Sequence, residues 1–268
     1  MEKARVPTGI TGLDEIIEGG LPAGYCYTVV GGPGAGKTIF GAQFIHKGIT
    51  DHQQNGVYVT LEEPPGSIIA AMKRFGWNLL DEQGKGRLAL IDASPISPRE
   101  RFLIDLTVSR GGFSKYLVKA GALGTETFDV NGILNVIKDA AKEIKAKRCV
   151  IDSLSALVLQ YRDVFELRQS TLSLVKALTE MGLTTLLLSE NVEERSDVYR
   201  FGIESFLCQG VIVLRTPHRD ERIVRTLQVQ KMRGVKHLEK PCLFKITEKG
   251  IEVYPDAPIL AEGAKAAR

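Results

Sequence analysis

Several features that would assign a protein to a class are scarce in this chain of 268 residues. No two of its four cysteines form a C-x-x-C pair, which argues against a disulfide framework or a cysteine zinc site. Its four histidines show no metal-ligand spacing. No apolar run approaches the roughly 18 residues of a membrane-crossing helix. We therefore expect a soluble protein whose cysteines are reduced core residues, namely Cys26, Cys149, Cys208 and Cys242.

An excess of charge of one sign is also missing. The formal net charge is +3, which gives no bulk reason to expect binding to nucleic acid or to an anionic membrane. The first residues do not resemble a secretory signal, so we expect a cytoplasmic protein. No linker, repeat or low-complexity segment divides the sequence, and its length suits one large domain over residues 1–268.

Short apolar runs alternate with amphipathic stretches through most of the chain. This pattern predicts an α/β fold with a mostly parallel twisted sheet and helices on both faces. The later strands follow one another without helices, which predicts an antiparallel extension of the sheet. Residues 93–129 are expected to form a surface excursion, and 256–268 a loose tail. The expected strands are 26–30, 57–60, 88–91, 149–152, 183–188, 211–214, 223–232, 243–246 and 251–254. The expected helices are 39–47, 67–75, 131–147 and 164–181.

Residues 31–38 carry the strongest chemical signal. They read GGPGAGKT, which is G-x-x-x-x-G-K-[ST] between an expected strand and an expected helix. Glycines let successive backbone amides face an anion, and the helix adds its positive N-terminal end. The alternative is a glycine turn that binds nothing, and the retained Lys37-Thr38 pair argues against it. The expected nucleotide-binding residues are Gly32, Pro33, Gly34, Ala35, Gly36, Lys37, Thr38 and Ile39.

An acidic residue at the end of a later strand favours a metal site. Lys37 is placed to reach the β- and γ-phosphates of a nucleotide, and the Thr38 hydroxyl is placed to bind Mg²⁺. Asp152 ends the apolar run of residues 149–152, where phosphate-loop enzymes place a carboxylate that holds Mg²⁺. The alternative for Asp152 is a helix cap before Ser153. Beside a phosphate loop we favour the metal role, with ATP or ADP and Mg²⁺ as the ligands.

Two consecutive carboxylates follow the strand after the phosphate-loop helix. Carboxyl ends of parallel strands gather at one edge of the sheet, so we expect Glu62 and Glu63 near the phosphate loop. A carboxylate there could orient or deprotonate the water that attacks the γ-phosphate. The alternative is a solvated loop pair. We favour catalysis by Glu62, Glu63 and Lys37, with Glu62 as the first choice for the base.

A pair of cations near the end of the chain is less informative. Lys231 and Arg233 are two positions apart, so they would point to one side of an extended strand. They could contact the phosphates of a nucleotide that is bound to a neighbouring subunit. From the residues alone, a charged strand end in solvent is the better interpretation.

Taken together, these segments resemble the KaiC branch of the RecA-like phosphate-loop ATPases. The segment 6–14 with 19–24 resembles the start of KaiC and RadA proteins. More specific to KaiC are Thr60–Pro64, Arg74–Trp77, Ile151–Leu154 and Lys231–Gly234, with His237 beyond. The resemblance covers nearly all of residues 5–255, apart from 95–127.

The resemblance implies a RecA-like core that binds ATP between the subunits of a hexameric ring. It implies that Glu62 and Glu63 are the hydrolytic acids. It also implies that Lys231, Arg233 and His237 reach the nucleotide of the neighbouring subunit, and that Arg74 lies near the base or sugar. A protein partner is expected but not identified.

The chain also departs from the family pattern. The cyanobacterial clock protein has two such domains in tandem, whereas this sequence has one, so clock switching by autophosphorylation is not implied. Phe206 replaces the hydroxyl residue beside Ser205, and we do not expect phosphorylation there. A RadA-like DNA-binding recombination protein is the alternative. Its DNA loops would be residues 160–169 and 191–200, which mix acidic and basic residues and are not clearly basic.

Overall fold

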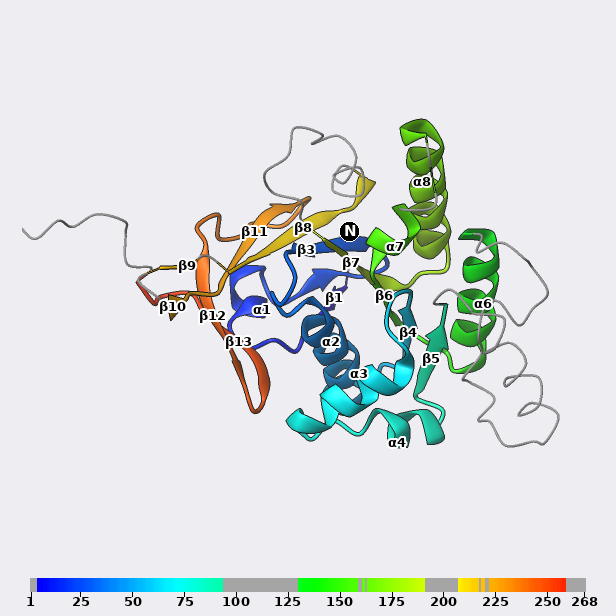
Figure 1. Cartoon of the computed structure of the whole chain (residues 1–268), viewed down its shortest axis with the longest axis horizontal. Coiled ribbons are helices and arrows are strands. Elements are labelled where there is room, and N and C mark those ends of the chain that lie inside the picture. Colours follow the sequence, from blue (N-terminus) through cyan, green and yellow to red (C-terminus); the bar gives the residue numbers. More distant parts are fainter. Residues whose placement is uncertain are drawn as a thin grey trace, which may run out of the picture.

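The computed structural model describes residues 4–93, 130–158, 161, 163–190, 207–216, 218–219 and 222–258 (Figure 1). Except for Ala93, the predicted excursion 93–129 lies outside these ranges, and so does the predicted tail beyond residue 258. All four cysteines lie within them, and each is buried and outside any disulfide.

The centre of the molecule is one large sheet. Its strands are β3 (Cys26–Gly31), β4 (Gly56–Thr60), β5 (Leu88–Asp92), β6 (Arg148–Asp152), β7 (Thr184–Glu190), β8 (Gly210–Arg215), β11 (Thr226–Met232), β12 (Cys242–Thr247) and β13 (Gly250–Tyr254). The nine strands have the order β13-β12-β11-β8-β3-β7-β6-β4-β5. The six from β8 to β5 are parallel, and β11, β12 and β13 add to β8 in antiparallel fashion. The expected parallel sheet with an antiparallel extension is confirmed.

Helices cover both faces of this sheet (Figure 1). One face carries α2 (Lys37–His52), α3 (Pro65–Met72) and α4 (Leu79–Gly84), and the other carries α6 (Val130–Glu143) and α8 (Val164–Glu180). Strand side chains alternate between the two layers, as the pleat requires. Tyr58 packs in the cluster with α2, whereas Val57 and Val59 pack in the cluster with α6 and α8. Both faces of β4 are therefore buried, which explains its unbroken apolar run.

Smaller elements complete the described part. A short ribbon pairs β1 (Arg5–Val6) with β2 (Leu21–Pro22), and another pairs β9 (His218–Arg219) with β10 (Arg222–Ile223). The short helices are α1 (Leu13–Ile16) and α7 (Leu154–Val158), and η1 (Lys73–Phe75) is a 3-10 turn after α3.

The N-terminal segment is joined to α2 by hydrogen bonds. The carboxylate of Asp14 accepts hydrogen bonds from the backbone N–H groups of Thr8 (2.7 Å) and Gly9 (3.2 Å). The buried amide of Gln43 on α2 donates to the carbonyls of Gly9 (3.1 Å) and Ile251 (3.1 Å) and accepts from the N–H of Ile251 (2.6 Å). These contacts join the segment and β13 to the helix that follows the phosphate loop.

Three predicted elements were wrong in extent. The helix expected over 39–47 runs from Lys37 to His52. The helix expected over 131–147 ends at Glu143, because Lys145 adopts a left-handed φ of 54° and the chain closes a Schellman turn. In that turn Lys145 N donates to the carbonyl of Lys142 and Ala146 N to the carbonyl of Ala141. The strand expected over 223–232 is interrupted after Ile223, and β11 begins only at Thr226.

Candidate functional site

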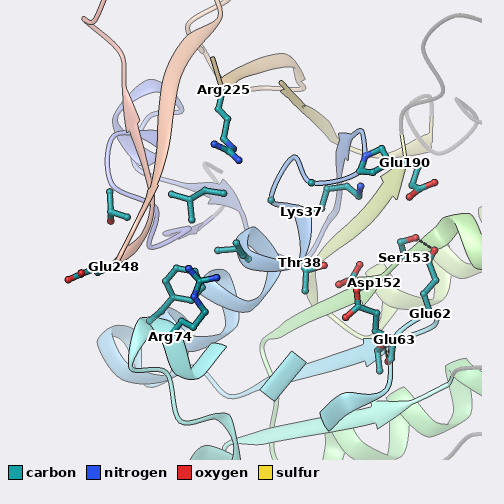
Figure 2. A pocket seen from close by; sticks show the side chains of 18 residues that line it. Lys37, Thr38, Glu62, Glu63, Arg74, Asp152, Ser153, Glu190, Arg225 and Glu248 are labelled. Carbon is teal, nitrogen blue, oxygen red and sulfur yellow. Dashed lines mark hydrogen bonds between the residues drawn. The ribbon is translucent and has the colours of Figure 1, made fainter. Parts of the chain in front are cut away.

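A cavity of about 890 Å³ lies at the carboxyl edge of the parallel strands. The phosphate loop after β3, the turn after β4 and the end of β6 meet there because these strands run in the same direction. Figure 2 shows Lys37 and Thr38 in the middle of the site, with Asp152, Glu62 and Glu63 to one side. The lining residues are Pro33, Gly34, Gly36, Lys37, Thr38, Ile39, Thr60, Glu62, Glu63, Arg74, Phe75, Asp152, Ser153, Glu190, Arg225, Ile246, Thr247 and Glu248.

The phosphate loop has the conformation that its glycines permit. Gly34 and Gly36 have positive φ values of 72° and 99°, which residues with a Cβ rarely adopt. Gly36 is the N-cap of α2, so the helix begins at Lys37 and points its N-terminal end at the cavity. Lys37 Nζ donates to the carbonyls of Gly31 (2.8 Å) and Gly32 (3.1 Å). The ammonium group is thereby held over the loop.

Asp152 lies beside Thr38 at the end of β6. Its Oδ2 accepts a hydrogen bond from the hydroxyl of Tyr58 (2.7 Å), and the Thr38 hydroxyl is a second donor. Burial raises the pKa of Asp152, the two hydrogen bonds lower it, and the nearby charges of Glu62 and Glu63 raise it again. A hydroxyl and a half-buried carboxylate are oxygen ligands of the kind that Mg²⁺ prefers, so these residues fit the expected metal.

The two consecutive glutamates come to the same side of the cavity, as expected from their place after β4 (Figure 2). Both are exposed to the open cavity. The Ser153 hydroxyl donates a hydrogen bond to Oε1 of Glu62. The Thr60 hydroxyl donates to the backbone carbonyl of Glu63 (2.5 Å) and closes the turn that carries the pair. Their carboxylates are therefore available to a ligand that occupies the cavity.

The opposite side of the cavity combines residues that the sequence suggested and residues that it did not. Arg74, expected near a base or sugar, lines the cavity from η1. Phe75 lies next to it and stacks on Trp77, with ring centroids 4.7 Å apart. Arg225 points into the site from the break before β11, and Thr247 comes from the end of β12 (Figure 2).

Sequence reasoning missed Arg225, Ile246 and Thr247 at the end of β12, Glu248 in the turn after it, and Glu190 at the end of β7. Glu190 could have been found, because it ends a buried strand of the parallel sheet, as Asp152 does. The others come from the antiparallel extension, whose place in the sheet has no local sequence signal.

Lys231, Arg233 and His237 are not brought into this cavity. Met232 pairs with Gly210, which pairs with Tyr27 at the start of β3, whereas the phosphate loop follows the end of β3. The cations therefore lie at the opposite edge of the sheet. Lys231 Nζ donates to the carbonyl of Cys208 (2.8 Å), and Arg233 stands in the turn beyond β11 rather than on the strand.

Residues 6–258 match the ATPase family described as KaiC. This chain belongs to the KaiC ATPase family. The match spans both sides of the cavity, from the phosphate loop to the turn between β12 and β13. It confirms the resemblance and the RecA-like α/β fold that the sequence suggested.

Individual KaiC relatives support the assignment. The chain is 34% identical over 255 residues to the circadian clock oscillator protein KaiC of Parasynechococcus marenigrum (strain WH8102), and 35% identical over 254 residues to that of Thermostichus vulcanus. Each alignment covers 95% of this chain, but only 46% and 45% of those proteins. The chain thus spans about half the length of the clock proteins it matches.

A solved structure agrees over the whole fold. The KaiC-like protein PH0186 from Pyrococcus horikoshii OT3 superposes with a TM-score of 0.76 and is 36% identical. The superposition covers 94% of this chain and 100% of that one.

Some expectations fall outside the described residues. They are the predicted DNA loop 191–200, parts of 160–169, and Ser205. Within the described ranges, no helix combines the length and apolar character needed to cross a membrane.

Proposed function

We propose that this KaiC-family protein binds ATP with Mg²⁺ in the cavity and hydrolyses it to ADP and phosphate. The observation that supports the proposal is the meeting of three groups from separate strands in one cavity: the phosphate loop, Asp152, and the Glu62–Glu63 pair. Together they can supply phosphate binding, a metal ligand and a base.

The geometry suggests how the residues share the reaction. Lys37 exchanges its two carbonyl contacts for oxygens of the β- and γ-phosphates. Mg²⁺ held by Thr38 and Asp152 would neutralise phosphate charge. Glu62 accepts a proton as a water oxygen bonds to the γ-phosphorus, and the bond from that phosphorus to the bridging oxygen breaks to release ADP.

We further propose that the active form is a homo-oligomeric ring, with a hexamer expected from the family, and that its nucleotide state regulates a protein partner. The placement of Lys231 and Arg233 at the edge opposite the phosphate loop supports a role toward a neighbouring subunit. The similarity to circadian clock oscillator proteins supports a regulatory role.

One experiment compares binding with turnover. Lys37→Ala should weaken ATP binding by about tenfold to a hundredfold, because a charge-assisted contact is worth roughly 1.5–3 kcal/mol. Glu62→Gln/Glu63→Gln should bind ATP as the parent does but hydrolyse it about 10²–10⁴ times more slowly. Lys47→Ala is the matched control, since this lysine is on the same helix but pairs with Asp51 at the surface. Parent-like binding by Lys37→Ala, or parent-like turnover by the Gln pair, would refute the assignment.

A further inference from the structure

Ser153 contacts the glutamate that we propose as the base. It follows Asp152 at the end of β6, and its side chain is only 2% exposed. Its hydroxyl donates to Oε1 of Glu62, the interaction drawn as a dashed line in Figure 2. Glu62 itself is exposed to the cavity. A buried donor therefore holds the carboxylate of a residue that lines the cavity.

The backbone brings the two residues together. β4 and β6 are paired up to Thr60 and Asp152, and the pairing continues by one more contact, from Leu61 N to the carbonyl of Asp152 (2.6 Å). Glu62 directly follows Leu61 after β4, and Ser153 directly follows Asp152 after β6. Because strand register sets this proximity, the contact does not depend on a chance orientation of a long side chain.

The neighbouring glutamate is held differently. Glu63 is fixed through its backbone carbonyl, which accepts from Thr60 Oγ1, whereas among the described residues no side chain hydrogen-bonds its carboxylate. Among the described residues, Glu62 thus has a side chain that anchors one of its carboxylate oxygens, whereas Glu63 does not. A base that must meet a water in one orientation benefits from such an anchor.

We propose that Ser153 is a positioning residue that orients Glu62 as the base for the attacking water. Glu62 differs from Glu63 in having this supporting hydrogen bond. The inference rests on the proposed ATP hydrolysis and adds to it a residue of the cavity lining whose hydroxyl acts through Glu62. The Ser153 hydroxyl holds Oε1, and Oε2 of Glu62 accepts the proton of the attacking water.

The test is a set of double-mutant cycles on the full chain, with steady-state ATP turnover measured over a range of ATP concentrations in excess of the enzyme. Ser153→Ala should lower kcat by about tenfold to a hundredfold with KM for ATP unchanged, as expected when a supporting hydrogen bond of a reacting group is lost. In a Glu62→Gln background the same change should have no further effect on kcat. In a Glu63→Gln background the full loss should remain.

Ser155→Ala is the matched control. Its hydroxyl, also buried, accepts from the backbone N–H of Glu190 (3.0 Å) and makes no hydrogen bond with Glu62 within the described part of the chain. Any effect of Ser155→Ala should be the same with or without Glu62→Gln. An unchanged kcat in Ser153→Ala, an equal loss in the Glu62→Gln background, or a loss of ATP binding would each overturn the proposal. If Glu62→Gln itself leaves turnover unchanged, the proposed function fails instead.

Discussion

Single residues in the cavity are held by hydrogen bonds to neighbouring residues. Lys37 donates to two loop carbonyls, and Asp152 and Glu62 accept from Tyr58 and Ser153. Such contacts fix polar groups in advance, so less reorganisation is needed when charge develops during a reaction. In the proposed ATP complex a phosphate oxygen would replace a neutral carbonyl as the acceptor of Lys37, which adds attraction between opposite charges.

His46 on α2 should make stability depend on pH. Its ring stacks on Trp77, with centroids 5.3 Å apart, and its Nδ1 is buried without a hydrogen-bond partner in the described part of the chain. Burial lowers the pKa of His46 from its ordinary value of 6.5, nearby Lys47 lowers it further, and Asp51 opposes this. The unfolded chain therefore takes up this proton at a higher pH than the folded chain does. The contribution to stability is present above about pH 6.5 and is lost as the pH falls towards the lowered pKa.

Chemical denaturation at about pH 7.5 and about pH 5.5 measures this loss. His46→Gln should lose less unfolding free energy between the two pH values than the parent does. His52→Gln, at the exposed end of the same helix, serves as the control and should follow the parent. Equal losses in His46→Gln and the parent would contradict the prediction.

How much of the site could be predicted depended on whether its residues are consecutive. Residues 31–38 are consecutive, from the end of β3 to the start of α2, so the motif alone places Lys37 and Thr38 in the cavity. Asp152 and Glu62 required only the rule that parallel strands end at one edge. Arg225 and Thr247 reach the same cavity from antiparallel strands, and their approach depends on the order of strands in the finished sheet.

At the scale of elements, α2 and β6 meet through a buried arginine. Arg148 is 0% exposed, its Nε donates to Gln54 and its Nη1 to the carbonyl of Phe44, each at 2.8 Å. Its guanidinium also lies 4.5 Å from the centre of the Phe44 ring. The arginine fits because α2 carries a glycine, Gly48, at the point of contact. A Cβ there would lie 2.3 Å from Arg148 Nε.

Gly48→Ala should therefore destabilise the protein by about 1–3 kcal/mol, the usual cost of overpacking. Helix propensity alone would predict the opposite change in stability, because it favours alanine over glycine by roughly 1 kcal/mol. Gly132→Ala on α6 is the matched control, because a Cβ there meets nothing within 4 Å, and it should be neutral or stabilising. Urea denaturation of both variants decides the question, and a Gly48→Ala variant as stable as Gly132→Ala would contradict it.

Element boundaries were the least predictable part of the fold. The amphipathic pattern of 131–147 gave α6 its buried face, with Ile133, Leu134 and Ile137 inside. It did not reveal the end of the helix, because a lysine, Lys145, occupies the left-handed position that glycine usually marks. The strand pattern of 223–232 likewise did not reveal the break from which Arg225 enters the cavity.

At the scale of the whole molecule, the phosphate loop and the pair Lys231 and Arg233 lie at opposite edges of the sheet. Tyr27, level with Met232, and Gly31, which begins the phosphate loop, are four residues apart on β3. At about 3.3 Å per residue this is about 13 Å along the strand, before the loop is counted. Lys231 also points at Cys208 on its own edge. Lys231 and Arg233 are thus too far from the phosphate loop of their own chain to serve its nucleotide, although they could serve that of another subunit.

In a closed head-to-tail ring, every site would join the phosphate loop of one subunit to the cationic edge of the next. Arg233→Ala subunits keep the glutamate pair, and Glu62→Gln/Glu63→Gln subunits keep Arg233. In an equal mixture that exchanges subunits, about one quarter of the sites would join an intact pair to an intact Arg233. We therefore expect each variant to be inactive alone and the mixture to recover up to about a quarter of the parent ATPase rate. Mixing Arg233→Ala with a chain that carries all three substitutions is the control and should recover nothing, because no site is then complete. A monomer that hydrolyses ATP at the full rate at high dilution would contradict completion of the site by a neighbour.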